Sequence, residues 1–280
     1  MINLENYDVI DSVTAEDGTK VEILEIKKLR GSSDLRVAES LYFAAEAGLR
    51  VKMVRITINN SKTRVEPGAL YFMKGDLEIK ASTGGGVLKG LSRKMLTGET
   101  FFVNEIHGTG EIWLEPTFGH FLLHNIGKDE GVIVDKSLFY AGTSNLDVSA
   151  HKQKNISSAL MGGEGWFQTK ITGRGIAVLY SPVPVQEILK VDLTKDKLWV
   201  DGNFAMMRSL GVNFWVQKSS KSWLATSVSG EGLLQTFAGE GSVWIAPTEG
   251  VYENMSNRSG IIDMANAPGS TGTLVGKKKK

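Results

Sequence analysis

Histidines are the residues of this sequence best suited to metal or acid–base chemistry, and the chain has four: His107, His120, His124 and His151. His120 and His124 stand four residues apart in an apolar stretch. On a β-strand such side chains share a face but lie about 13 Å apart, too far to bind one metal ion. A cupin-type site needs histidines two residues apart with a carboxylate and a third histidine. The spacing therefore disfavours a metal-dependent, cupin-like enzyme, which we keep as an alternative.

Other catalytic motifs are incomplete. The chain has no cysteine, which excludes thiolate nucleophiles, disulfides and cysteine-ligated metals. A glycine run at 84–86 is followed by Lys89 and Gly90 but not by the Gly-Lys-Ser/Thr that closes a phosphate loop. No Gly-x-Ser-x-Gly nucleophile elbow occurs. We predict a protein that is not an enzyme, with no cofactor and no identifiable small-molecule substrate.

The charge balance argues against a nucleic-acid partner. Lysine and arginine number 32 against 31 acidic residues, so the net charge is +1. A non-specific nucleic-acid binder would carry a clear basic excess. The N-terminus does not read as a secretory signal, and no apolar stretch approaches the roughly 18 residues of a spanning helix. We expect a cytoplasmic protein, with a peripheral membrane position as the variant of that expectation.

Basic and apolar residues mix in three irregular segments. This mixture suits an anionic membrane surface, where each cation contributes about 1 kcal/mol. The alternative is three solvated loops whose apolar residues close the ends of a barrel. The candidate membrane- or partner-facing residues are Lys89, Arg93 and Lys94, then Lys152 and Lys154, then Lys218 and Lys221.

The elements that would position these segments come from an internal repeat. Each copy has a Gly-Glu pair, an apolar run, a Gly-x-Gly, a second apolar run and a proline. The Gly-Glu pairs are spaced by 65 and 67 residues. We interpret the repeated glycines and glutamates as structural turns. They are Gly98, Glu99, Gly108 and Gly110, then Gly163, Glu164, Gly173 and Gly175, then Gly230, Glu231, Gly239 and Gly241.

Short apolar runs bounded by glycine indicate β-strands in every copy. The predicted fold class is all-β, with three tandem, pseudo-symmetric β-sandwich or barrel units. We expect an N-terminal extension at 1–48, repeats at 49–117, 118–183 and 184–251, and a polar C-terminal tail at 252–280 whose lysine-rich end is disordered.

Local patterns add several predictions. Apolar runs at 100–106 and 111–115 predict a hairpin whose turn is His107-Gly108-Thr109-Gly110. A further turn is expected at 59–61, a strand at 19–24 and a helix at 34–47.

A carboxylate opens one turn in each copy, at Glu66, Asp135 and Asp201. We expect each carboxylate to accept backbone amides within its own turn. The alternative is that these three, or the repeated Glu99, Glu164 and Glu231, line a pseudo-threefold axis and bind a cation.

The sequence also resembles a known family. The similarity covers roughly 43–247 and is strongest at 66–75 (EPGALYFMKG), 153–160 (QKNISSAL) and 230–237 (GEGLLQTF). These segments resemble bacterial members of the family named for the yeast altered inheritance of mitochondria protein twenty-four. The resemblance implies a double-stranded β-helix type of fold, grouped with the tryptophan RNA-binding attenuation protein. It implies no catalytic residues, and the yeast relative suggests membrane-associated scaffolding.

We therefore predict a non-enzymatic scaffold or binding protein that self-associates as a homo-oligomer and lies peripherally on a membrane. RNA binding by fold analogy is the alternative from another class. It would need a basic stripe with exposed aromatics, whereas Trp113, Trp166 and Trp244 occupy strand positions better explained by packing.

Overall fold

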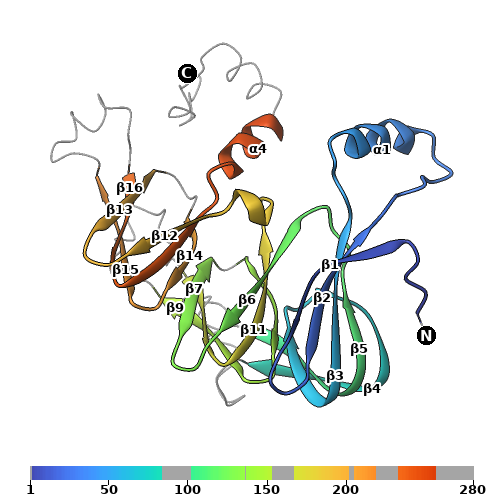
Figure 1. Cartoon of the computed structure of the whole chain (residues 1–280), viewed down its shortest axis with the longest axis horizontal. Coiled ribbons are helices and arrows are strands. Elements are labelled where there is room, and N and C mark those ends of the chain that lie inside the picture. The colour runs from blue at the N-terminus through green and yellow to red at the C-terminus, as the bar shows by residue number, and fades with distance from the viewer. Residues whose placement is uncertain are drawn as a thin grey trace, which may run out of the picture. The chain divides into compact units, whose positions relative to one another are not determined.

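The computed structural model describes residues 2–83, 102–135, 137–152, 167–201, 205–218 and 233–256. Of these residues, 61% lie in strands and 11% in helices, which confirms the predicted all-β class (Figure 1). The chain divides into two compact units. Unit 1 is Met1–His151 with Phe167–Val185, and unit 2 is Lys152–Trp166 with Gln186–Lys280. The boundaries expected for the three repeats stay predictions.

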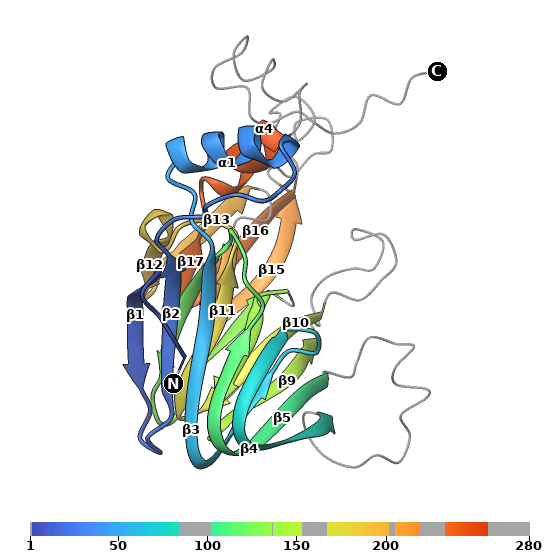
Figure 2. The same ribbon diagram turned by 90° about the vertical axis from the view of Figure 1, so that its right-hand side faces the viewer.

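The main sheet of unit 1 is antiparallel and nearly closes into a barrel. Its strands are β1 (Tyr7–Thr14), β2 (Lys20–Ile26), β3 (Lys52–Val65), β4 (Leu70–Thr83), β5 (Phe102–Leu114), β6 (His120–Ile126), β8 (Phe139–Thr143) and β11 (Gly175–Ser181). The order is β1-β2-β3-β8-β11-β6, and β1 contacts β6. Strand β5 also pairs with β3, and β4 pairs with β5. Figure 2 shows β1, β2 and β3 side by side.

A second run of strands in unit 1 is β7 (Gly131–Asp135), β10 (Phe167–Gly173) and β9 (Leu146–Lys152), in that order. The helix α1 (Arg36–Glu46) connects β2 to β3. The expected strand at 19–24 and helix at 34–47 are thus confirmed. Strand β1, which pairs with β2, was not predicted.

Strand β2 shows why the main sheet is stable, because it is covered on both faces. Val21 and Ile23 point into the main core of unit 1, while Leu24 packs with Met53 and Trp113 in a separate cluster. Each fully buried side chain of this size contributes about 1.5–3 kcal/mol. The main core consists of Val21, Ile23, Val54, Ile56, Ile58, Val65, Ala69, Ile106, Ile112, Leu114, Phe121, Ala141, Ile176 and Val178.

Unit 2 contains two antiparallel groups of strands. The first has the order β12 (Leu189–Leu193), β17 (Gly241–Ile245), β14 (Ala205–Ser209), and the second has the order β13 (Lys197–Asp201), β16 (Leu233–Gly239), β15 (Val212–Lys218). A short 3-10 helix, η2 (Val185–Glu187), precedes β12 and α4 (Glu249–Ser256) follows β17. The core of this unit consists of Leu193, Val200, Val212, Phe214, Phe237 and Val243. Helix α4 was not predicted, and the expected disordered end lies outside the described residues.

The predicted hairpin at Gly108 is wrong. Strand β5 continues from Phe102 to Leu114 without reversing. The other two Gly-x-Gly motifs also separate consecutive strands that join different neighbours: β10 pairs with β7 whereas β11 pairs with β6 and β8, and β16 pairs with β13 and β15 whereas β17 pairs with β12 and β14. In the second and third copies the motif therefore lies where the chain changes neighbours, whereas in the first copy β5 keeps β3 and β4 as neighbours on both sides of it.

The turn predicted at 59–61 is wrong for the same reason. These residues lie inside β3, where the pairing with β5 shifts between Ile58 and Ser61 and Asn60 has a φ of 46°. Gly75 in β4 has a φ of 136° and Gly108 in β5 has a φ of 127°. A bulge in one strand and positive φ angles in the two others make all three strands bend together. We call this bend the β3–β4–β5 corner.

The corner requires glycine at 108 for two reasons. Its φ is positive, and a Cβ built there would fall on the carbonyl oxygen of Asp76, well inside van der Waals contact. We therefore expect Gly108→Ala to lower the free energy of unfolding by about 3 kcal/mol. The matched control is Gly68→Ala, at a φ of 91° with open space around the site. It should cost only about 1 kcal/mol for backbone strain. Urea denaturation of both variants checks this, and equal losses would contradict the steric account.

Candidate functional site

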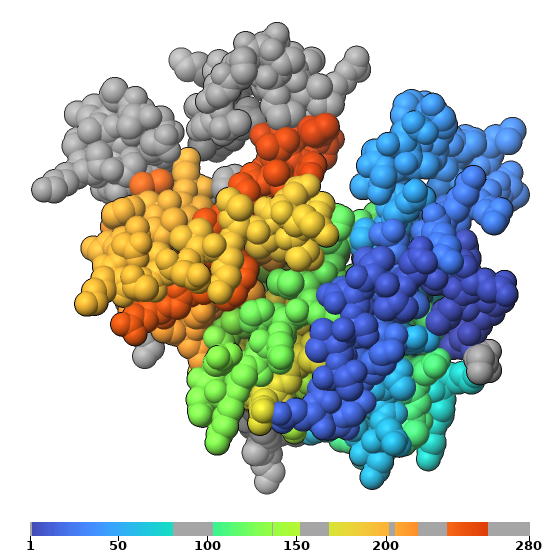
Figure 3. Space-filling model, in the orientation of Figure 1, coloured from blue at the N-terminus to red at the C-terminus, as the bar shows by residue number. Residues whose placement is uncertain are grey.

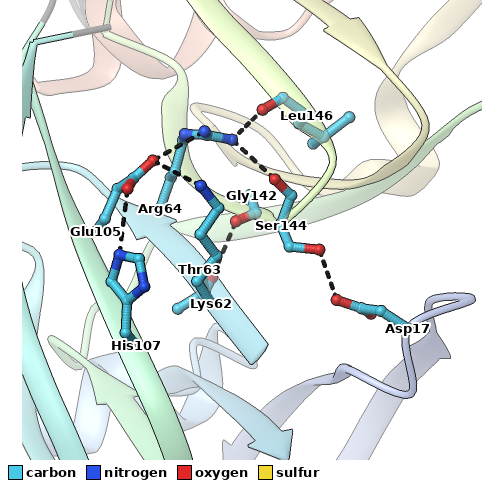
Figure 4. Close-up of polar contacts among 9 residues, drawn as sticks. All are labelled: Asp17, Lys62, Thr63, Arg64, Glu105, His107, Gly142, Ser144 and Leu146. Atoms are coloured by element: carbon cyan, nitrogen blue, oxygen red, sulfur yellow. Dashed lines mark hydrogen bonds and ion pairs between the residues drawn. The ribbon is translucent and has the colours of Figure 1, made fainter. Parts of the chain in front are cut away.

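Glu105 on β5 is the centre of a group of charged side chains in unit 1. The pairing of β3 with β5 places Arg64 opposite Glu105 and Lys62 opposite His107. Oε1 of Glu105 accepts from Arg64 at 2.8 Å and from Lys62 Nζ at 3.3 Å, and Oε2 lies 3.2 Å from Nε2 of His107 (Figure 4). Because alternate residues of a strand share a face, these four side chains converge on one side of the sheet.

The same group ties separate segments of unit 1 together. The guanidinium of Arg64 also donates to the carbonyl oxygens of Ser144, at 3.1 Å, and Leu146. The hydroxyl of Ser144 donates to Asp17 at 2.6 Å, and Ser61 donates to the same Asp17 oxygen at 2.7 Å. Asp17 lies in the turn between β1 and β2. We call Asp17, Ser61, Lys62, Arg64, Glu105, His107 and Ser144 the corner network.

Both carboxylates of the corner network are held in the charged form. Burial alone would raise the pKa of Glu105, but the charges of Arg64 and Lys62, with hydrogen bonds from Lys62 and His107, lower it below its usual value. Burial likewise acts to raise the pKa of Asp17, and hydrogen bonds from Ser144, Ser61 and Thr19 lower it overall. The Glu105 side chain is only 14% exposed. Charged hydrogen bonds at such a site are stronger than those in water.

An open groove of about 510 Å³ lies beside this network. Asp76 and Glu78 of β4 face it from one side, and Lys62 and His107 face it from the other. Lys62 is already paired with Glu105 and Glu78 with Lys80, so Asp76 is the lining charge that has no ion-pair partner within the described residues. The lining residues are Asn60, Ser61, Lys62, Asp76, Glu78, His107 and Gly108.

The Glu66 carboxylate, expected to accept amides in its turn, accepts none within the described residues, and burial alone acts on its pKa. In the turn after β3, the amide of Ala69 donates to the main-chain oxygen of Glu66 at 3.1 Å. In the turn after β7, the amide of Leu138 donates to the main-chain oxygen of Asp135 at 3.1 Å. Main-chain oxygens close these turns because they already lie in the right position. The residues that follow Asp201 are outside the described part of the chain.

The Glu66 side chain belongs instead to a half-buried cluster with Tyr140. Burial raises the pKa of Glu66. Burial, with the charges of Glu115 and Glu66 and the neighbouring Tyr180, raises the pKa of Tyr140 to about 12. The phenol is therefore neutral at physiological pH, and its hydroxyl donates to the main-chain oxygen of Glu115 at 3.4 Å.

Unit 2 has one deeply buried cation among its described residues. Arg208 is 3% exposed, and burial lowers its pKa to about 10, so it remains charged at neutral pH. Its Nε donates to the main-chain oxygen of Val212 at 3.2 Å, and its guanidinium lies 5.3 Å from the ring centre of Phe214. These contacts give Arg208 a structural role in holding β14 against β15.

The four histidines lie on three strands. His107 belongs to the corner network, His120 and His124 both lie on β6, and His151 lies on β9. Within the described residues, no three histidine or acidic side chains converge as a metal site would require.

Most of the residues singled out from the sequence cannot be placed. Lys152 and Lys218 end β9 and β15, but their side chains are not described. The glycines that are described lie at the bends: Gly108, Gly110, Gly173, Gly175, Gly239 and Gly241. The residues outside the described part are Lys89, Arg93, Lys94, Lys154, Lys221, Gly98, Glu99, Gly163, Glu164, Gly230 and Glu231.

Sequence reasoning missed the corner network. The available signal was the alternation of charges at Lys62 and Arg64, and again at Glu105 and His107. That spacing places each pair on one strand face. It does not show which strands become neighbours. The wrong hairpin prediction also concealed the pairing of β5 with β3 that brings Arg64 to Glu105.

The fold and the network define an all-β protein built on a curled antiparallel sheet with bent strands. The chain belongs to the family described as Mitochondrial biogenesis AIM24, whose model matches residues 43–248. It is 23% identical over 228 residues to an uncharacterised protein of Streptococcus pyogenes serotype M6, covering 75% of this chain and 86% of that protein.

A crystal structure of a Streptococcus pyogenes protein, a structural genomics target, has a similar fold. Its TM-score is 0.52 at 18% sequence identity, and the match covers 70% of this chain and 88% of the other. No helix in the described residues has the length and apolarity that crossing a bilayer requires.

The corner network should make stability depend on pH through Glu105. Its pKa is lowered in the folded state, so its contribution is complete above the usual value of 4.5 and is lost as pH falls through the folded value. We expect Glu105→Gln to lower the free energy of unfolding at pH 7 by about 2 kcal/mol, because Arg64 loses its partner. The difference from the native protein should shrink between pH 5 and 3.

Urea denaturation across this pH range measures the effect. Glu78→Gln is the control, because the Glu78–Lys80 pair is an exposed surface ion pair. Its removal should change stability by no more than about 0.5 kcal/mol. A loss for Glu105→Gln that is the same at pH 3 and pH 7 would contradict the electrostatic role of Glu105.

Proposed function

We propose that this protein is a non-enzymatic scaffold that associates with its own copies and lies peripherally on an anionic membrane surface. The pairing of its buried charged groups supports a structural role for them. Glu105 is paired with Arg64 and Lys62, and the 3%-exposed Glu22 is paired with Lys20 and Arg55 at 2.7 Å each. Charges committed to such pairs hold strands together.

The observation that carries the membrane proposal is the exposure of apolar side chains in the segment 27–50, which we call the α1 arm. It leaves β2, forms α1 and returns to β3, and Figure 3 shows it in light blue projecting from the strands of unit 1. None of the residues of α1 is buried. Tyr42 and Phe43 are 62% and 61% exposed, and Leu35 just before the helix is 87% exposed. Exposed aromatic and aliphatic side chains of this kind suit the interface of a lipid bilayer.

Cations lie around these apolar residues. The α1 arm contains Lys27, Lys28, Arg30, Arg36 and Arg50 against three carboxylates, so its net charge is positive. Lys28 and Arg30 have no ion-pair partner in the described part of the chain. Positive charge beside exposed apolar surface is the pattern of peripheral binding to anionic lipid.

The arm also leaves an apolar groove unfilled. A cavity of about 330 Å³ separates the inner side of α1, with Leu41 and Ala44, from Leu29 and Leu49 in the flanking segments. Lys27, Lys28 and Arg50 also line it. The helix therefore rests loosely on unit 1, and apolar lipid contact would cover surface that the fold leaves open.

Neutralising the free cations of the α1 arm should weaken membrane binding. We expect Lys28→Gln/Arg30→Gln to lower affinity for phosphatidylserine-containing vesicles about 30-fold, since each cation contributes about 1 kcal/mol. The matched control, Lys128→Gln/Lys195→Gln, removes two exposed lysines elsewhere and should leave affinity nearly unchanged. Tyr42→Ser/Phe43→Ser should also weaken binding. Vesicle co-sedimentation at low and high salt measures all of these variants.

The same assay separates the α1 arm from the basic segments seen in the sequence. A triple variant, Lys89→Gln/Arg93→Gln/Lys94→Gln, tests the first of those segments. If only the triple variant loses binding, the arm is not the membrane contact. Native protein that does not sediment with anionic vesicles at low salt, or that binds neutral phosphatidylcholine vesicles equally well, would contradict the membrane proposal.

A further inference from the structure

The outer edge of β4 is open. Strand β4 pairs with β5 on one side and, within the described residues, with no strand on the other. It has 14 residues, more than twice the common strand length of about 5–6. A long, exposed strand edge offers a row of unpaired backbone groups to another strand.

The side chains of β4 suit a protein partner rather than water alone. Tyr71, Phe72 and Ile79 are 55%, 38% and 43% exposed. Lys74 and Asp76 are exposed and make no ion pair in the described part of the chain. Natural edge strands are often protected from pairing by charges such as lysine, but β4 has opposite charges two residues apart, which can complement each other.

Building on the self-association proposed above, we propose that β4 pairs antiparallel with β4 of a second copy about a two-fold axis that passes between the two Gly75 residues. In this register Lys74 stands opposite Asp76 of the partner subunit, and the symmetry repeats the pair. Met73 stands opposite Leu77 of the partner subunit, and Tyr71 opposite Ile79 of the partner subunit. Opposite charges and apolar pairs directly across two strands each stabilise a sheet.

Charge selects this register over its neighbours. Met73 and Leu77 pack on the core of unit 1, so the pairing must keep residues of one face opposite each other. Among the symmetric registers that do so, one centred on Lys74 or Asp76 places that residue opposite its own copy. A register centred on Leu77 opposes Lys74 to Lys80. Of the four registers centred on residues 74 to 77, only the one centred on Gly75 places no like charges opposite each other.

The corner favours the same centre. Strand β4 bends at Gly75, whose φ is 136°. A two-fold axis between the two Gly75 residues aligns the bend of one copy with the bend of the other, so both arms of the strand can pair. A shifted centre would set a bend against a straight stretch. Gly75 also has no side chain to occupy the space at the axis.

The pairing would also complete the groove beside the corner network. Asp76 and Glu78 line that groove, and Asp76 makes no ion pair in the described part of the chain. In the proposed register, Lys74 of the partner subunit comes beside Asp76, and Phe72 of the partner subunit comes beside Glu78. The second copy thus supplies a positive charge to Asp76 and apolar surface beside Glu78.

Charge exchange tests the pairing directly. Light scattering of the full chain should give a mass equal to an even number of copies. Asp76→Lys places one lysine opposite another, Lys74 of the partner subunit, and we expect it to weaken association about tenfold or more. The exchange Lys74→Asp/Asp76→Lys restores opposite charges and should restore association. Glu46→Lys makes the same charge change on exposed α1 and should have no effect.

Cross-linking tests the register. The chain has no cysteine, so Tyr71→Cys/Ile79→Cys provides the only thiols. The two positions lie about 13 Å from Gly75 on separate arms of one strand, so mild oxidation cannot join them within one chain. A disulfide forms between thiols directly opposite each other across two strands and not between diagonal neighbours about 7–8 Å apart. We expect covalent dimers from the double variant and none from either single variant. Phe72→Cys/Lys80→Cys, which would react if the centre were Asp76, should not cross-link.

The outcomes separate the two proposals. A monomer at micromolar concentration would overturn both the self-association and the β4 pairing. An assembly whose mass does not respond to Asp76→Lys, and that gives no Tyr71→Cys/Ile79→Cys dimer, would overturn the β4 pairing and leave self-association through another surface. Cross-linking by Phe72→Cys/Lys80→Cys alone would overturn the Gly75 centre.

Discussion

The structure of unit 1 depends on one close approach between backbones, where the carbonyl oxygen of Asp76 occupies the space that a side chain at Gly108 would need. This contact lets β4 and β5 bend together while their pairing continues on both sides. The bulge at Asn60 lets β3 follow the same bend. Without this corner, the long strands would run straight past the core, and the sheet could not curl toward closure. The position of the groove and the direction of the open edge of β4 both follow from this corner.

The corner network adds electrostatic interactions at that bend. Arg64 joins Glu105 to the main chain around Ser144, and Asp17 joins the first hairpin to the same place. Three segments distant in sequence are thereby fixed at one point by charged hydrogen bonds. Groups with this many partners inside the fold stabilise its geometry. We therefore expect contacts with other molecules on the surfaces that face outward.

Two such surfaces lie in the described part of unit 1, and they differ in kind. The α1 arm offers loosely packed apolar residues beside unpaired cations, whereas the edge of β4 offers ordered backbone groups with alternating charges. The first is the surface proposed to meet an anionic membrane, and the second is the edge proposed to pair with a strand of fixed register. A scaffold that pairs through β4 would present at least two arms together, and the affinity of paired arms for a membrane would exceed that of one. The family match and the fold likeness are compatible with this arrangement and assign no site of their own.

Composition and apolar periodicity determined the all-β class, the strand at 19–24 and the helix at 34–47, because these features depend on residues close together in the chain. The meaning of the Gly-x-Gly motifs was decided only by tertiary structure. Glycine with positive φ suits a hairpin turn and a sheet corner equally well, and the choice depends on which distant carbonyl approaches it. The same holds for Glu105: its alternation with His107 places both on one strand face, but Arg64 reaches them only because β3 pairs with β5. Local physics specified the strands, and long-range pairing specified their neighbours and the surfaces that remain uncovered.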